Sequence, residues 1–271
     1  MRNPRLIVAA FIMIAGLVTY YGQRQVNPVT GETQHIGLTA DQEVALGLNS
    51  APQMAQQFGG DDPSEEDQQR LFEIGKRVVL SSPAAKSPYK FQFRLLADQK
   101  TVNAFALPGG PIFITRALYD RLKTDEQIAG VLGHEVGHVV GRHSAEHMAK
   151  SQLAQSMVGA AAVATTDEYG RGQQGAMIAA FVAQMTQMKY GRKDELEADK
   201  FGVHYMRDAG YDPNALIAVM DILEEAGGGT KRRPEFMSTH PDPGNRRENI
   251  KAEIAKAKAG GSARAAGAGS N

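Results

Sequence analysis

The spacing of hydrophobic positions changes several times along the chain, and each spacing predicts a different element. Within 68–79 the apolar residues recur every three to four positions, which is typical of an amphipathic helix. Within 91–95 apolar and polar residues alternate, which predicts a strand. Two further strands are expected over 102–107 and 112–114, because a Pro-Gly-Gly-Pro turn separates these two apolar runs.

Two segments carry the signature of a helix start, in which a threonine precedes a glutamine by three residues. These capping boxes lie at 39–42 and 124–127, and apolar residues at helical spacing follow each of them. Another helix is expected over 193–207. Because most periodic segments are helical and the strands are few and short, the pattern predicts an α+β fold, mostly helical with a small three-stranded sheet.

The N-terminus has the layout of an export signal. Arg2 and Arg5 precede an apolar run over 6–21, and positive residues before such a run stay on the cytoplasmic side. The run is slightly shorter than the roughly 20 residues that span a bilayer. Residues 20–23 make a poor cleavage site, so within 1–25 a membrane anchor is favoured over a cleaved signal peptide. The first predicts an inner-membrane protein that faces the periplasm, and the second predicts a periplasmic protein.

The remainder of the chain is expected to form a single domain with a tail. No repeat or linker divides residues 38–255. Residues 256–271 are mostly Ala, Gly, Ser and Lys without apolar periodicity, which predicts a disordered tail. The segment 157–188 is rich in Ala, Gly, Gln and Met and fits either a helical hairpin or a mobile cover over a cleft.

Composition excludes several classes of function. The 271 residues include 30 Lys and Arg and 30 Asp and Glu, so the formal net charge is zero and no general electrostatic attraction to nucleic acid is expected. The hydrophobic fraction of 42% is sufficient for a buried core. Cysteine is absent, which excludes disulfides, thiolate nucleophiles and cysteine-rich zinc modules. Any metal site must therefore use His, Asp and Glu.

The sequence His-Glu-Val-Gly-His at 134–138 is the strongest chemical signal in the chain. His134 and His138 are four residues apart, so one helical face presents both imidazoles to the same ion. Glu135 lies beside them and can take a proton from water. Two surface histidines are the alternative, but the apolar residues on both sides predict a buried helix, in which two imidazoles need a partner.

A catalytic zinc ion needs a third protein ligand and one open position. A metzincin would have a third histidine where this chain has Ser144, so that pattern fails. The sequence Glu-Leu-Glu-Ala-Asp at 195–199 offers carboxylates instead. Glu195 and Asp199 share a helical face, so Glu195 is favoured as the ligand and Asp199 as the acceptor that orients a ligand imidazole. Glu197 is expected on the opposite, solvated face.

Together these two motifs resemble peptidase family M48, which includes the HtpX-like and CAAX-prenyl-protease-like zinc endopeptidases. The similarity extends over about 38–252 and includes the segment 102–110, Arg192, and the Ser-Thr-His-Pro segment 238–241 followed by Arg246. Only one candidate membrane span is present, so the resemblance is to the single-domain envelope members. Prenyl-protein processing is therefore not implied.

The resemblance implies one zinc ion per chain and a metalloendopeptidase that degrades unfolded or misfolded envelope proteins. Glu135 would be the general base, His240 a second electrophile for the oxyanion, and Arg246 a positioning residue. The backbones of Asn103 and Ala104 could pair with an extended substrate. The alternative is a chaperone-like or binding module whose zinc site is closed by His240 as a fourth ligand. The sequence leaves the oligomeric state and the natural substrate open.

Overall fold

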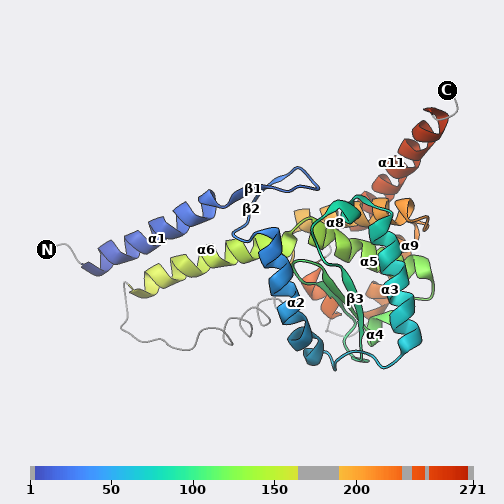
Figure 1. Ribbon diagram of the computed structural model, residues 1–271, viewed down its shortest axis with the longest axis horizontal. Coiled ribbons are helices and arrows are strands. Elements are labelled where there is room, and N and C mark those ends of the chain that lie inside the picture. Colours follow the sequence, from blue (N-terminus) through green and yellow to red (C-terminus); the bar gives the residue numbers. More distant parts are fainter. Residues whose placement is uncertain (1–3, 164–188, 228–233, 242–243, 268–271) are drawn as a thin grey trace.

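The computed structural model describes residues 4–163, 189–227, 234–241 and 244–267. It is mostly helical with a small three-stranded sheet, as predicted, and it has a second, two-stranded sheet that was not predicted. A long pair of helices, α1 and α6, extends away from the main body (Figure 1). In chain order the described elements are α1 (Pro4–Gly22), β1 (Arg24–Val26), β2 (Thr33–His35), α2 (Ala40–Gln57), α3 (Glu65–Leu80), the 3-10 helix η1 (Pro83–Lys86), β3 (Gln92–Leu96), β4 (Ala104–Ala106), β5 (Pro111–Thr115), α4 (Arg116–Tyr119), α5 (Asp125–Val140), α6 (His143–Val163), α8 (Arg192–Asp208), α9 (Ala215–Ala226), α10 (Glu235–Thr239) and α11 (Arg246–Gly267).

The central sheet has the strand order β3-β5-β4. Strands β3 and β5 are parallel, whereas β4 and β5 are antiparallel, with Phe105 opposite Phe113. These are the three strands expected from the sequence. Strand β5 begins at Pro111, where the missing N–H is tolerated because it is the first residue of the strand. In the described part of the chain β4 pairs only with β5, so β4 is an edge strand.

The two faces of this sheet pack against different helices, as period-two alternation requires. Ile112 and Ile114 belong to the main core together with residues of α3 and α5. Phe113 points to the other face, where it packs with Met54 of α2 and the half-buried Phe105. Helix α5 therefore lies directly beneath the edge strand, on the side away from α2.

Helices α5 and α8 approach closely because small residues line their contact. A Cβ placed on Gly133 would lie 3.3 Å from the Cα of Gly202, and one placed on Gly202 would lie 3.2 Å from the backbone nitrogen of His134. Gly137 is equally close to Ala198. Small residues let helix axes approach until backbones touch, and here that contact places 134–138 against 195–199.

The hairpin of β1 and β2 covers the C-terminal end of α5, an arrangement that the sequence did not indicate. The side chain of Asn27 donates to the carbonyl of Val140 at 2.8 Å, and Gln34 donates to the carbonyl of Gly141 at 2.5 Å. These are among the carbonyls that the end of a helix leaves without partners. Arg142, in the left-handed region with φ 58°, forms a buried ion pair with Glu43 of α2.

Three expectations about the ends and the middle of the chain can be compared with the structure. The disordered tail over 256–271 is wrong for most of its length, because α11 continues to Gly267. Ile250, Ile254 and Ala257 are buried, which ties this helix to the core, and the alanines beyond favour helix.

None of the helices in the described ranges is both long and apolar enough to cross a membrane. Of the segment 157–188, the residues after 163 lie outside the description.

Candidate metal centre

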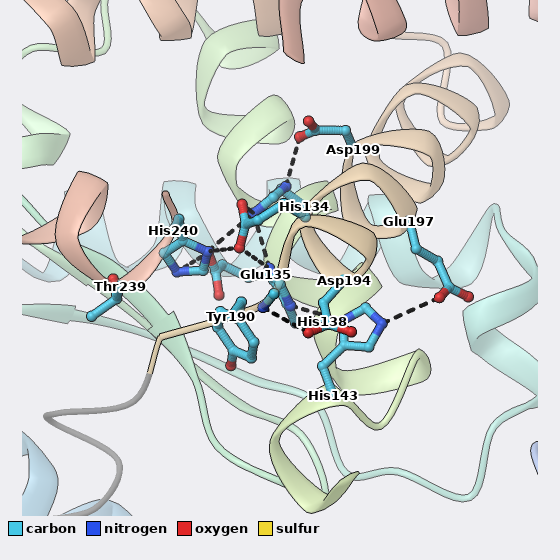
Figure 2. A network of polar contacts seen from close by, with 12 residues as sticks. His134, Glu135, His138, His143, Tyr190, Asp194, Glu197, Asp199, Thr239 and His240 are labelled. Atoms are coloured by element: carbon cyan, nitrogen blue, oxygen red, sulfur yellow. Dashed lines mark hydrogen bonds and ion pairs between the residues drawn. The ribbon is translucent and has the colours of Figure 1, made fainter. Parts of the chain in front are cut away.

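Four side chains from three parts of the chain converge on one buried point (Figure 2). His134 and His138 come from α5, Glu195 from α8, and His240 from the residue that follows α10. Each offers one ligand atom, and the four atoms all lie within 4.8 Å of one another. All four side chains are at most 1% exposed. The structure thus brings together the predicted ligands and adds His240 to them.

The distances between these atoms fit a tetrahedral metal ion. The Nε2 atoms of His134 and His138 are 3.0 Å apart, and each lies 3.5 Å from an oxygen of Glu195. Bonds of 2.0–2.1 Å to a tetrahedral zinc ion separate the ligand atoms by about 3.4 Å. Two imidazoles and a carboxylate are also the donors of many catalytic zinc sites. The residues present therefore fit this metal.

The charge states of His138 and Glu195 suit metal binding. Burial lowers the pKa of His138 well below 6.5, so that its imidazole is in the neutral form that ligates metals. Burial alone would raise the pKa of Glu195, but His240 and Arg246 hold it well below its ordinary value, so this side chain is a carboxylate.

Asp199 and Arg246 both contact the ring of His134. The Nδ1 atom of His134 lies 2.9 Å from the carboxylate of Asp199, which in turn accepts two hydrogen bonds from Arg246 at 2.6 and 2.7 Å. Burial opposes the charge on Asp199, but Arg246 and His134 keep its pKa below the ordinary value. A second contact of Arg246 reaches Glu195 at 3.2 Å. Both residues therefore contact the predicted ligands but lie outside the group of four that could hold a metal ion.

His138 has a comparable support that the motifs did not reveal. Its Nδ1 atom lies 2.9 Å from Nδ1 of His143, and the other ring nitrogen of His143 lies 3.4 Å from Glu197. Any Cβ at Gly141 would lie 2.4 Å from His143, so only glycine leaves room for this ring. Glu197 is therefore outside the ligand group, as expected, although it contacts a histidine rather than solvent alone.

Tyr190 is a second residue at the site that sequence reasoning missed. Its ring stacks on His138 with centroids 3.9 Å apart, and its hydroxyl lies 2.9 Å from Ser144. The backbone N–H of Tyr190 donates to the carbonyl of Thr239, the residue before His240. Burial raises the pKa of its phenol, so the hydroxyl stays protonated. The signal for this tyrosine is weak in the sequence because it follows a long segment without periodicity.

Glu135 points into the same centre and lacks hydrogen-bond partners among the described residues. Both of its carboxylate oxygens are buried, and Nε2 of His240 lies 3.7 Å from one of them. Burial raises the pKa of Glu135, although His240 and His134 oppose the rise. A buried acceptor without a donor costs about 1–3 kcal/mol. Such a group is suited to accept a proton from a molecule bound at the site.

The two residues predicted to contact substrate lie in different environments. The Asn103 backbone bonds within the sheet, because its carbonyl accepts from the N–H of Thr115 and its N–H donates to the hydroxyl of Thr115. In an antiparallel pair, the backbone N–H and carbonyl groups of successive residues point alternately toward the partner strand and away from it. The backbone groups of Ala104 therefore point away from β5, to the free edge.

Comparison with known proteins agrees with this geometry. Residues 65–254 match peptidase family M48. The mitochondrial metalloendopeptidase OMA1 of Schizosaccharomyces pombe is 27% identical over 91% of this chain and 71% of its own length. The β-barrel assembly-enhancing protease of Escherichia coli is 26% identical over 86% of this chain and 50% of its own. OMA1 of Arabidopsis thaliana is 32% identical over 59% and 30%. This chain thus spans only part of each relative.

Proposed function

This chain belongs to peptidase family M48, and on that premise we propose that it is a zinc-dependent endopeptidase that hydrolyses peptide bonds in unfolded or misfolded proteins of the cell envelope. The observation that carries the proposal is the buried convergence of two imidazoles and a carboxylate beside a carboxyl group that has no hydrogen-bond partner among the described residues. Members of the family are zinc-dependent metalloproteases, which agrees with this donor set.

Three residues would hold the zinc ion: His134, His138 and Glu195. When bound, the ion supplies a Lewis acid that makes water more acidic and stabilises negative charge on a peptide oxygen. Glu135 accepts the proton of the attacking water and delivers it to the leaving amine. Asp199 keeps the ring of His134 oriented by accepting from its Nδ1–H.

The base is tested by replacing Glu135 with Gln, which keeps the size of the side chain and removes its basicity. The variant Glu135→Gln is expected to retain one zinc ion per chain and to lose at least a hundredfold in cleavage of unfolded casein. Glu126→Gln, in the first turn of the same helix, is the matched control and should cleave normally. Unchanged casein cleavage by Glu135→Gln, with zinc bound, would exclude Glu135 as the base.

His240 supports two roles, and these separate an active protease from a closed binding module. Its Nδ1 atom is 3.0 Å from Glu195 and 3.3 Å from Nε2 of His134, within the ligand group. This position favours a fourth ligand that occupies the site needed by water. Its Nε2 atom faces Glu135, which suits an electrophile. Activity that rises in His240→Ala would indicate the blocking role, whereas a fall with zinc retained would indicate catalysis.

Substrate backbone is proposed to pair with the free edge of β4. The predicted contact at Ala104 is compatible with this pairing, whereas the backbone of Asn103 already bonds to β5 through Thr115. An edge strand offers unpaired N–H and carbonyl groups to any extended chain, whatever its sequence. Unfolded proteins present such chains, so this edge suits the proposed substrate class.

The envelope location is proposed from the N-terminal segment 1–25, acting as a signal peptide or an anchor. Helix α1 packs along α6, and its apolar side chains include Leu6, Phe11 and Val18, which are 61%, 72% and 67% exposed. One relative is a β-barrel assembly-enhancing protease, which agrees with an envelope role. Sequencing the mature N-terminus and fractionating membranes from periplasm would distinguish the two alternatives, and full-length protein in the cytosol would contradict both.

A further inference from the structure

A cavity of about 240 Å³ adjoins the metal centre on the side of the edge strand. The apolar side chains of Met54, Phe58 and Phe105 line it. The rest of its lining consists of Ala106 and of residues with polar groups, Thr101, Asn103, Tyr190, Glu235, Thr239 and His240. We propose that this cavity receives a large apolar side chain of the extended substrate and thereby sets the sequence preference of the protease. The inference rests on the proposed function and adds to it a preferred class of substrate residue.

The register of the edge strand directs a substrate side chain into this cavity. The alternation along β4 points the backbone groups of Ala104 and Ala106 away from β5, toward the free edge. The backbone of Val102, just before the strand, points the same way, and its carbonyl accepts from the N–H of Phe236 in α10. A peptide added to that edge continues the pleat. Its residue opposite Phe105 therefore places its side chain on the same face as Phe105, where the cavity lies.

The phenylalanines in the wall of the cavity are held in place by ring contacts. The ring of Phe105 lies 5.0 Å from that of Phe58 and 4.9 Å from that of Phe113, between centroids. Met54 is 1% exposed and belongs to the same core cluster. Rigid apolar walls beside a desolvated site favour leucine or phenylalanine over glycine by about tenfold to a hundredfold.

One carboxylate side chain lies at the cavity. Glu235 begins α10 and is exposed to solvent. A carboxylate at this position repels an acidic substrate side chain, so aspartate should be the least favoured residue. Figure 2 shows His240, which follows in the same segment, directed toward the metal centre.

The test separates binding from cleavage by using the zinc-loaded Glu135→Gln protein. Fluorescein-labelled peptides of Ala, Ser and Thr, each with one central Phe, Leu, Gly or Asp, are titrated by anisotropy. The Phe and Leu peptides should bind about tenfold to a hundredfold more tightly than the Gly peptide, and the Asp peptide most weakly. Adding Phe58→Ala should remove most of this advantage without weakening the Gly peptide.

Two further variants control for loss of folding and for unspecific attraction. Glu235→Lys, on the surface, should selectively strengthen binding of the Asp peptide. Phe72→Ala, an exposed phenylalanine on α3, should leave all four affinities unchanged. Equal affinity for the Phe and Gly peptides, or a preference that survives in Phe58→Ala, would overturn the inference. Selective binding of these peptides without zinc-dependent cleavage by the unaltered chain would contradict the proposed function and leave the cavity assignment standing.

Discussion

The close contact between α5 and α8 can be tested with two glycine substitutions in one helix. At Gly137 a Cβ would lie 3.0 Å from the Cβ of Phe201 and 3.1 Å from both Cα and the carbonyl oxygen of Ala198. At Gly130 the nearest atoms are a side-chain methyl of Leu216 at 3.4 Å and the sulfur of Met206 at 3.5 Å. The first contact is with the backbone of α8, whereas the second is ordinary packing against side chains that can move.

The expected free energies follow from this difference. Replacing an interior helical glycine with alanine stabilises the helix by about 1 kcal/mol, equally at both positions. At Gly137 the added methyl group also forces the two helices apart, and overpacking of this kind costs about 1–3 kcal/mol. Gly137→Ala should therefore be about 1–3 kcal/mol less stable than Gly130→Ala. A shift of a few tenths of an ångström also separates Glu195 from the two imidazoles, so zinc affinity should fall about tenfold.

Urea unfolding of the chelator-treated variants, followed by circular dichroism, measures the first quantity, and competition with a zinc-binding dye measures the second. Gly130→Ala should be as stable as the unaltered chain or more stable, with the same zinc affinity. If Gly137→Ala proved as stable as Gly130→Ala and bound zinc as tightly, the contact would not be tight enough to set the geometry of the ligands.

Two other predictions concern carboxylates. Asp199→Asn should lower zinc affinity by about tenfold to a hundredfold, because the ring of His134 loses its charged acceptor; Asp208→Asn on the same helix is the control in the dye competition. Asp62→Asn should lower the free energy of unfolding at neutral pH by about 1–3 kcal/mol, because Arg116 donates two hydrogen bonds to that partly buried carboxylate. Arg116 holds the folded-state pKa of Asp62 below 3.8, so this contribution is present above pH 3.8. The difference between the variant and the unaltered chain should disappear as the pH falls through the lowered pKa, and a constant difference down to pH 2 in acid-urea titrations would contradict the assignment.

Residues that act within one helical turn could be identified from their spacing. The pair His134 and His138 faces one point because a helix places residues four apart on one side. The same reasoning placed Glu195 and Asp199 together and Glu197 apart from the ligand group. The capping box at 39–42 is present with both of its hydrogen bonds. In each case the interaction joins groups that are neighbours in the chain.

Contacts that leave a single helix depended on packing that no spacing reveals. His143 returns to His138 only because Gly141 leaves room for its ring and Arg142 adopts a left-handed conformation. Tyr190 precedes α8 at the end of a long aperiodic segment, yet it stacks on His138. The covering of α5 by the β1–β2 hairpin likewise depends on partners elsewhere in the chain.

Spacing within α5 and α8 established which side chains could ligate a metal and which class of chemistry they serve. It could not establish that His134 meets Asp199, 65 residues away, or His240, 106 residues away. These two contacts depend on how closely two helices approach and on where α10 ends. Helix propensity and side-chain periodicity are properties of neighbouring residues, whereas the approach of two helices depends on the shape of both surfaces, which exists only after the chain has folded.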